Sequence, residues 1–219
     1  MAVITISRQY GSGGDEIAIK LAERLGYEHV NKELISEIAR RAKVPETEVE
    51  RLDERGEGAI SRFLSKLFSS DRYLSYLGTA YWEMSVPCYL ESCAPDMGFL
   101  NREDYLKFIE AAISDLYRRG NVVIVGRGGQ VILKDKPGVV HVRVVAPLNA
   151  RVRRVAVILG VSEEEAARIV KERERCREEF LRQMFGIDPN DPTLYHLVIN
   201  TGAVEEWKSV ELIASLVGG

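Results

Sequence analysis

Short runs of β-branched residues recur along the chain, and segments with helical spacing separate them. Such runs predict buried strands at Val3 to Ser7, Val122 to Val125, Val139 to Val145 and Leu197 to Asn200, with a shorter fifth strand at Tyr27 to Val30. Strands that alternate with helices are typical of a parallel sheet covered by helices. The pattern therefore predicts an α/β protein built on a parallel sheet.

Three helices can be placed from their apolar spacing and their end signals. The apolar positions of residues 17–25 fall on one helical face, and Gly26 then ends that helix. Asn101 is a helix cap in front of another apolar face. Residues 162–165 form a capping box, Ser-Glu-Glu-Glu, which begins a helix that runs toward Gln183.

The strand and helix pattern divides a single domain into three parts. The core comprises residues 1–30, 101–147 and 193–219, a helical insertion covers about 31–100, and a second insertion covers about 148–192. An aromatic-rich stretch, residues 73–89, lies in the first insertion. We expect its aromatic side chains to fill the small core of that insertion, although a ligand pocket or a dimer surface would use the same residues.

Composition narrows the classes of function. The chain has 219 residues, 46% of them hydrophobic, and a formal net charge of −3, so it can bury one sizeable core and shows no overall preference for nucleic acid. No run reaches 18 apolar residues, and Met1 leads directly into a strand without a signal segment. These features predict a cytoplasmic protein with no membrane contact. The three cysteines lack metal-type spacing, and we expect them to be reduced.

A glycine loop lies between the first predicted strand and the first predicted helix, where a P-loop belongs. In the P-loop pattern G-x-x-x-x-G-K-[ST], backbone N–H groups bind phosphates, the Lys reaches the terminal phosphates and the hydroxyl holds Mg²⁺. Here Arg8 stands at the first glycine and Gly14 at the lysine. The candidate phosphate-binding residues are Gly11, Ser12, Gly13, Gly14, Asp15 and Glu16. A tight strand-to-helix turn without a ligand would use the same glycines.

Several arginines follow predicted strands or lie in the second insertion. Arg127 comes directly after the strand at 122–125, so it should share the rim of the sheet with the glycine loop. Phosphoryl transfer needs such cations, because negative charge spreads over the transferring oxygens. For Arg153, Arg175 and Arg182 we favour a solvated helix face, on which Glu174 and Glu178 pair with neighbouring arginines.

The chain resembles the cytidylate kinase-like proteins, a branch of the P-loop nucleoside monophosphate kinases. The matching segments, in chain order, are ITISRQYGSGG, NKELI, GNVVIVGRGG, HVRVVAPLNARVRRV and FGIDPNDPTLYHLVINTG. The resemblance implies a P-loop core, a monophosphate-binding helical insertion and a helical lid. It also implies transfer of the γ-phosphoryl group of ATP to a nucleoside monophosphate, typically CMP or dCMP, with Mg²⁺.

The resemblance also implies roles for particular residues. The loop from Gly11 to Gly14 would contact the donor phosphates, Arg127 would hold the acceptor phosphate, and Arg177 would face the acceptor. Arg151 and Arg154 match lid arginines that close on the transferring group. Arg173 and Glu174 are weaker candidates for substrate binding in the same segment.

Three departures from cytidylate kinases limit these roles. Gly14 replaces the P-loop lysine, and Arg8 is the best placed cation to compensate. Glu16 stands beside the hydroxyl position, where a carboxylate could bind Mg²⁺ or repel phosphate. Gly128 stands where the relatives carry the aspartate of a G-R-D segment, a residue associated with acceptor recognition, so the cytosine assignment is open.

Two further readings therefore remain beside the kinase. One is a catalytically weak nucleotide-binding or regulatory module on a kinase fold, and the other is a kinase of a different small molecule. The partners in each case are small-molecule ligands, and a homodimer is compatible with the sequence. The true acceptor, the preferred donor and the oligomeric state stay open at this stage.

Overall fold

The computed structural model describes residues 2–31 and 102–217. The expected first insertion at about 31–100, with its aromatic stretch at 73–89, lies outside the described residues. The strands are β1 (Val3–Arg8), β2 (Glu28–Val30), β3 (Val122–Val125), β4 (Val139–Val145) and β5 (Leu197–Asn200). The helices are α1 (Gly14–Leu25), α8 (Arg102–Arg119), α9 (Gly129–Ile132), α10 (Leu148–Leu159), α11 (Glu163–Phe185) and α12 (Glu206–Ser215), with a 3₁₀ turn η2 (Pro192–Leu194).

The described strands form one sheet in the order β2-β3-β1-β4-β5, with every neighbouring pair parallel. This confirms the predicted α/β fold with a parallel sheet. Three of the predicted strands have the observed bounds. β1 continues one residue further than predicted, because Arg8 still pairs with Val144 of β4. β2 begins after Tyr27, whose N–H is bonded to the carbonyl of Ala22 in the turn that ends α1.

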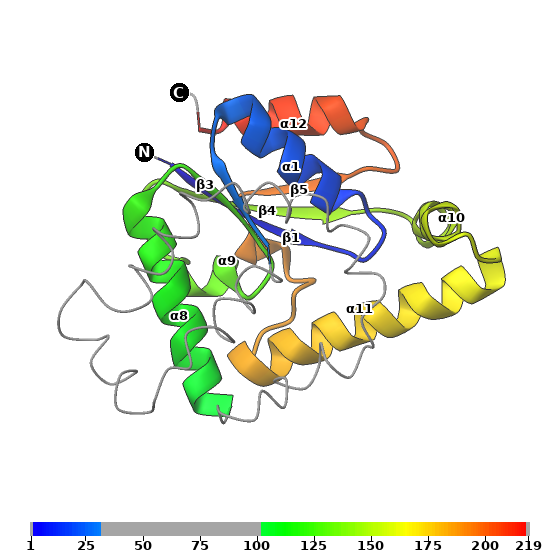
Figure 1. Ribbon diagram of the computed structural model, residues 1–219, viewed down its shortest axis with the longest axis horizontal. Helices are drawn as coiled ribbons and strands as arrows, with labels where there is room; N and C mark the ends of the chain where they lie inside the picture. Colours follow the sequence, from blue (N-terminus) through cyan, green and yellow to red (C-terminus); the bar gives the residue numbers. More distant parts are fainter. Residues whose placement is uncertain (1, 32–101, 218–219) are drawn as a thin grey trace.

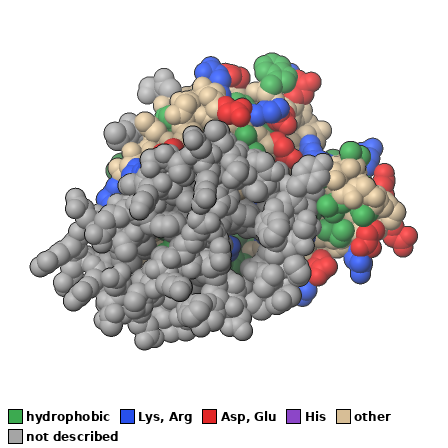
Figure 2. Space-filling model, viewed as in Figure 1, with side chains coloured by type: hydrophobic (Ala, Val, Ile, Leu, Met, Phe, Trp, Pro, Cys, Tyr) green, Lys and Arg blue, Asp and Glu red, His purple; other side chains and the backbone are tan. Residues whose placement is uncertain are grey.

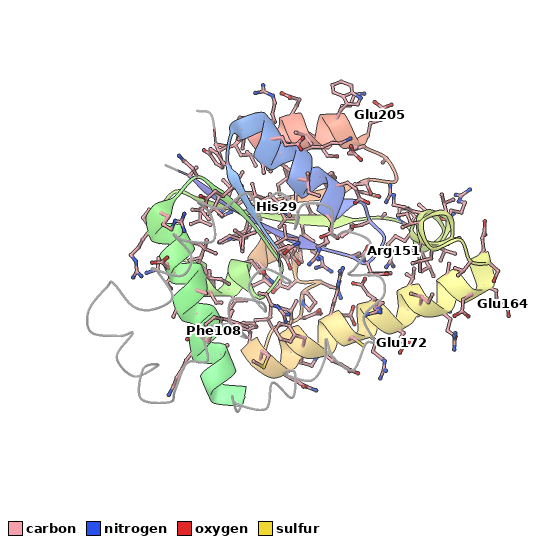
Figure 3. All side chains as sticks on the ribbon, viewed as in Figure 1. His29, Phe108, Arg151, Glu164, Glu172 and Glu205 are labelled. Atoms are coloured by element: carbon pink, nitrogen blue, oxygen red, sulfur yellow. The ribbon has the colours of Figure 1, made fainter. Side chains whose placement is uncertain are left out.

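Side chains alternate across the sheet and build two layers of core. Helices α1 and α12 lie on one face of the sheet, and α8, α9 and α11 lie on the other (Figure 1). Ile4 and Ile6 of β1 pack with Leu21 of α1 and Ile213 of α12 on one face. On the other face, the core contains Phe108 of α8 (Figure 3), together with residues of β3, α9 and α11. The glycine loop emerges between these layers, at the end of the central strand.

The predicted helix ends are borne out in α1 and α11. Gly26 ends α1 in the left-handed conformation, with φ 66°. The Ser162 side chain accepts a hydrogen bond from the N–H of Glu165 at the start of α11. α11 continues two residues past Gln183 to Phe185, and Gly186 then ends it with φ 68°.

The surface carries charges of both signs. On the face shown in Figure 2, blue and red side chains are interspersed over the described part of the molecule. Within residues 2–31 and 102–217, no helix is both long and apolar enough to cross a membrane. Cys176 is buried on α11 and is disulfide-bonded, so the expectation of reduced cysteines is wrong at this position. Cys88 and Cys93 lie outside the described residues.

Candidate active site

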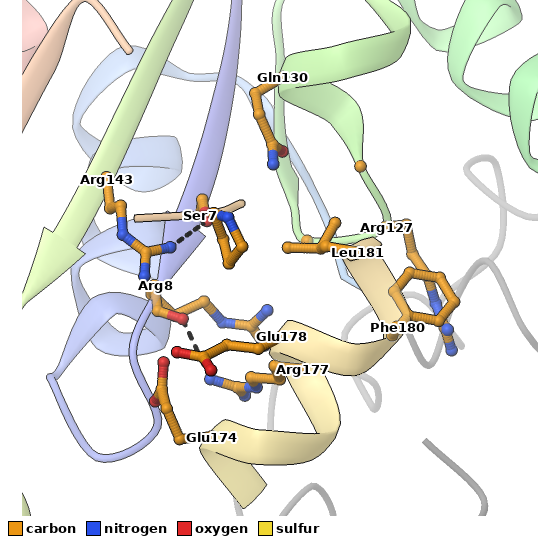
Figure 4. A pocket seen from close by; sticks show the side chains of 13 residues that line it. Ser7, Arg8, Arg127, Gln130, Arg143, Glu174, Arg177, Glu178, Phe180 and Leu181 are labelled. Atoms are coloured by element: carbon orange, nitrogen blue, oxygen red, sulfur yellow. Dashed lines mark hydrogen bonds between the residues drawn. The ribbon is translucent and has the colours of Figure 1, made fainter. Parts of the chain in front are cut away.

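A pocket opens at the carboxyl ends of β1, β3 and β4 and is covered by α11 (Figure 4). Parallel strands bring their carboxyl ends to one rim, which is where ligands bind in open α/β sheets. The lining contains the guanidinium groups of Arg8, Arg127, Arg143 and Arg177, the carboxylates of Glu174 and Glu178, and Ser7, Gly126, Gly128, Gln130, Phe180, Leu181 and Pro189. The positive side chains outnumber the negative ones, so the pocket suits an anionic ligand.

The glycine loop beside this pocket has the backbone of an anion cradle. Gly11 and Gly13 have φ angles of 76° and 82°, a conformation that L side chains rarely adopt. Gly13 caps α1 without any side-chain hydrogen bond to the first N–H groups of the helix. These N–H groups and the positive end of the helix dipole can therefore bind phosphate. Ser12 is fully buried in the same loop.

Arg8 occupies the space next to Gly14, the position of the ordinary P-loop lysine. A Cβ atom added at Gly14 would lie 2.5 Å from the Cβ of Arg8 and 3.2 Å from the Cβ of Val144. The Arg8 side chain is buried, and its Nε and Nη2 donate to Oδ1 of Asp15 at 2.9 Å. It enters the pocket between the glycine loop and Gly126. The lysine is thus excluded by packing, and a different cation stands beside the loop.

Arg127 lies in a tight turn that follows β3. The N–H of Gly129 bonds to the carbonyl of Gly126, and the two central residues, Arg127 and Gly128, have φ angles of 53° and 74°. The Arg127 guanidinium lies over the ring of Phe180 at 5.4 Å from its centroid. A non-glycine residue with positive φ costs backbone energy, and such strain is concentrated at functional sites.

The departure at Gly128 also has a physical cause. A Cβ atom added there would lie 2.3 Å from Cε2 of Phe185, in addition to the strain of the left-handed backbone. An aspartate at this position would have to displace the aromatic ring at the end of α11. The position of Phe185 therefore disfavours the aspartate of the G-R-D segment.

The two candidate lid arginines bond to the glycine loop. Arg154 Nη1 donates to the carbonyl of Gly11 at 2.7 Å. Arg151 is buried, and its Nη1 donates to the carbonyl of Tyr10 at 3.4 Å and to Oε2 of Glu174 at 3.2 Å. Burial lowers the pKa of Arg151 from its usual value, although the carboxylate of Glu174 opposes this shift. Arg151 thus holds the loop to α11, while Arg154 lies against the loop's glycines.

Glu174 and Arg177 extend from α11 toward the loop. Glu174 Oε2 also accepts a hydrogen bond from the N–H of Tyr10 at 2.9 Å. Arg177 Nη1 donates to the carbonyl of Arg8 at 3.3 Å (Figure 4). Its guanidinium lies over the ring of Tyr10. Arg173 is buried on the same helix but does not line this pocket.

The expected outer face of α11 is confirmed in part. Arg175 and Arg182 are exposed, as is Arg153 on α10. Arg175 pairs with Glu179, four residues later, and not with Glu174 or Glu178, which line the pocket. The expectation that Glu174 and Glu178 belong to a solvated ion-pair face is therefore wrong, because the helix turns both of them inward.

Sequence reasoning missed Ser7, Gln130 and Arg143 among the polar residues of the pocket. Arg143 is a charged residue inside the apolar strand at 139–145, and that interruption of the pattern was the available signal. It pairs in register with Ser7 of β1, and its Nη1 donates to Ser7 Oγ at 2.9 Å. Gln130 follows the Arg127 turn in α9 and carries no comparable signal.

The loop offers carboxylates for a cation at the start of α1. Mg²⁺ is usually held by one or two carboxylates together with substrate phosphates. Asp15 and Glu16 lie in the first turn of α1, although Asp15 is already paired with Arg8. The described residues contain no group of three or more acidic, His or Cys side chains that could hold a metal alone. The site fits a Mg²⁺ ion that arrives with phosphate, with Glu16 as the candidate protein ligand.

Comparisons with known proteins agree with this geometry. The profile of the cytidylate kinase-like family matches residues 3–203. The chain is 26% identical over 217 residues to a cytidylate kinase from Ignicoccus hospitalis, and the match covers 99% of each protein. The solved structure of an uncharacterized protein from Eubacterium ventriosum superimposes with a TM-score of 0.64 at 20% identity, over 99% of this chain and 98% of that one. That likeness shows the fold alone.

Other similarities cover shorter segments. The chain is 37% identical over 91 residues to uronate isomerase from Corynebacterium glutamicum, a match that spans 42% of this chain and 18% of that protein. For this relative and three cytidylate kinases, the matched segment spans half or less of the relative's own length. Such partial matches leave the activity of the whole protein to be inferred from its own site.

Proposed function

Because the chain belongs to the cytidylate kinase-like family, we propose that it transfers the γ-phosphoryl group of ATP to a nucleoside monophosphate. The family description makes CMP or dCMP the first acceptor to test. The proposal rests on the glycine loop, the family match and the set of arginines around one pocket. In such transfers, catalysis is mainly positioning and stabilisation of the charge on the transferring oxygens.

The observation that carries the proposal is the exchange of cation position between Arg8 and Gly14. The positive charge is carried by Arg8, the last residue of β1, and not by a lysine at the start of α1. The Arg8 side chain fills the space that a lysine at position 14 would need. Arg8 therefore supplies the positive charge that the loop lacks at Gly14. Its guanidinium points into the pocket, where the donor and acceptor phosphates would meet (Figure 4).

The other residues take roles according to their positions. The N–H groups of residues 13–16 bind the donor phosphates, and Arg154 neutralises them from the lid side. Arg127, which follows β3, and Arg177, on α11, both line the pocket and bind the acceptor phosphate. Arg151 and Glu174 hold α11 against the loop and so exclude water. Mg²⁺, held by Glu16 and the donor phosphates, would supply further neutralisation of charge.

The test is ADP release from ATP and Mg²⁺ against a panel of nucleoside monophosphates. We expect turnover that depends on the monophosphate and that falls on the order of 10²- to 10³-fold in Arg8→Ala. Arg24→Ala is the matched control, because Arg24 lies on α1 in an exposed ion pair with Glu211. Full activity of Arg8→Ala would contradict the proposed role of Arg8.

A weak nucleotide-binding module is the second candidate, and the contacts of two arginines favour it. Arg8 is paired with Asp15, and Arg154 donates to the carbonyl of Gly11, so both already have partners within the protein. This reading expects saturable nucleotide binding in a thermal-shift assay without ADP release. Monophosphate-dependent turnover would exclude it.

A further inference from the structure

Arg143 is a buried cation that forms no ion pair within residues 2–31 and 102–217. Its exposed fraction is 4%, and its Nη atoms donate only to neutral oxygens, Ser7 Oγ and Asn190 Oδ1, both at 2.9 Å. Burying a charge is costly unless a charge of opposite sign compensates it. Because Arg143 also lines the pocket, a ligand can provide that compensation.

Gln130 provides a second, independent observation in the same pocket. Its exposed fraction is 2%, and its Nε2 has no hydrogen-bond partner within the described part of the chain. Figure 4 shows its amide pointing from α9 into the pocket. A buried donor that lacks a partner costs free energy, so a ligand oxygen at this position would be favoured.

The carboxylates that line the pocket have partners elsewhere. Glu174 Oε2 accepts from Tyr10 N–H and Arg151, and Glu178 Oε1 accepts from Asn190 Nδ2 at 3.1 Å. None of these hydrogen bonds involves Arg143, which donates to Ser7 and Asn190 instead. Arg143 has no acceptor atom in any orientation, so an amino group placed against it would face another donor.

We propose that Gln130, Arg143 and Ser7 form a specificity subsite for an acceptor-only oxygen group of the substrate, a ring carbonyl or a carboxylate. The subsite disfavours an exocyclic amino group such as that of cytosine. This inference rests on the proposed kinase function, because it names the class of phosphoryl acceptor: a keto-pyrimidine nucleotide or a carboxylate-bearing acceptor. It agrees with the close approach of Phe185, which disfavours a carboxylate side chain at Gly128.

The first arm of the test compares UMP with CMP by calorimetry, because these two differ at C4 by an oxygen against an amino group. We expect UMP to bind roughly tenfold to a hundredfold more tightly than CMP, because CMP would leave the buried Nε2 of Gln130 without an acceptor. Gln130→Glu adds an acceptor at the subsite and should abolish or reverse that preference. Arg143→Met should weaken UMP at least tenfold, while Arg168→Met, in an exposed ion pair with Glu165, should leave it unchanged.

The second arm uses malonate, which presents carboxylates without a base. Malonate binding that disappears in Arg143→Met, with no binding of either nucleotide, would support the subsite and contradict the proposed nucleotide function. Turnover with CMP preferred over UMP, and the same preference in Gln130→Glu, would uphold the kinase and overturn the subsite. Failure of UMP, CMP and malonate to bind would also overturn it. If Arg143→Met does not fold, Gln130→Glu decides the outcome.

Discussion

Arg8 and Gly14 behave as a pair, because the Arg8 side chain occupies the space that a side chain at position 14 would need. A lysine introduced at Gly14 would place its Cβ 2.5 Å from the Cβ of Arg8, so Gly14→Lys alone should lose about 2 kcal/mol or more of unfolding free energy. Arg8→Gly alone should fold but lose most turnover. The double variant rebuilds the ordinary order of glycine and lysine, and we expect it to regain activity relative to Arg8→Gly.

Urea denaturation measures the stability of the single and double variants, and ADP release measures their activity. Stability losses that simply add in the double variant would mean that the two side chains do not interact. If the double variant is as inactive as Arg8→Gly, a lysine at position 14 does not replace the function of Arg8.

Gly128 offers a second test at the scale of one residue. Gly128→Asp combines a left-handed backbone, φ 74°, with a Cβ only 2.3 Å from Cε2 of Phe185. Gly26 also has positive φ, 66°, but no atom lies within 4 Å of an added Cβ, so Gly26→Asp isolates the backbone cost. We expect Gly128→Asp to be at least about 2 kcal/mol less stable than Gly26→Asp in urea denaturation. Equal losses in the two variants would argue that Phe185 moves away freely.

Some site residues could be predicted from sequence and others could not. Arg127 was expected at the rim because it follows a buried strand directly, and chain order alone carries that information. The direction of Arg143 depends on the register of β4 against β1, which pairs it with Ser7. Gln130 points inward because the Arg127 turn sets the start of α9. Neither the register of β4 nor the start of α9 can be read from the local spacing of apolar residues.

At the scale of elements, α11 is fastened to the glycine loop by Glu174. This carboxylate accepts from Tyr10 N–H and from Arg151, and its side chain is 15% exposed. Glu174→Ala would leave two donors without their acceptor, and we expect a loss of about 1–3 kcal/mol in unfolding free energy. Glu179→Ala, which removes the exposed partner of Arg175, should cost less than about 1 kcal/mol. Urea denaturation at neutral pH gives both values, and equal losses would mean that the Glu174 bonds contribute little.

The elements themselves were largely predictable, for identifiable reasons. β-branched runs between turn signals marked β3, β4 and β5, and the capping box marked the start of α11. The inward direction of Glu174 and Glu178 was not predictable, because the apolar stripe of α11 at Ala166, Val170 and Phe180 is interrupted by charged residues at 171–175. Contacts with α10 and the loop select the face that carries Glu174 and Glu178, and these contacts join residues far apart in the chain.

At the scale of the whole molecule, the parallel sheet gathers distant segments at one rim. β1, β3 and β4 each end there, so the glycine loop, the Arg127 turn and Arg143 meet although residues 8 and 143 are far apart in sequence. The same layering buries His29, on β2, beneath that rim (Figure 3). The positive charge of Arg8, a pocket residue, therefore also acts on His29.

His29 makes the stability of the whole fold depend on pH. Burial, and to a smaller extent the positive charge of Arg8, lower the pKa of His29 from 6.5 to about 4. Between these values the unfolded chain binds a proton that the folded chain does not, so stability falls as pH drops below 6.5 and the effect levels off below 4. From pH 7.5 to pH 5 the expected loss is about 2 kcal/mol from this group.

His29→Gln removes the titrating group while keeping a neutral polar side chain, and it isolates this contribution from other groups that titrate in the same range. Urea denaturation of both proteins at pH 7.5 and pH 5 should show the wild type losing about 2 kcal/mol more than the variant. Parallel losses in the two proteins would mean that His29 is protonated in the folded state at pH 5. In that case burial would disfavour the protonated imidazole less than expected, because burial is the larger cause of the lowered pKa.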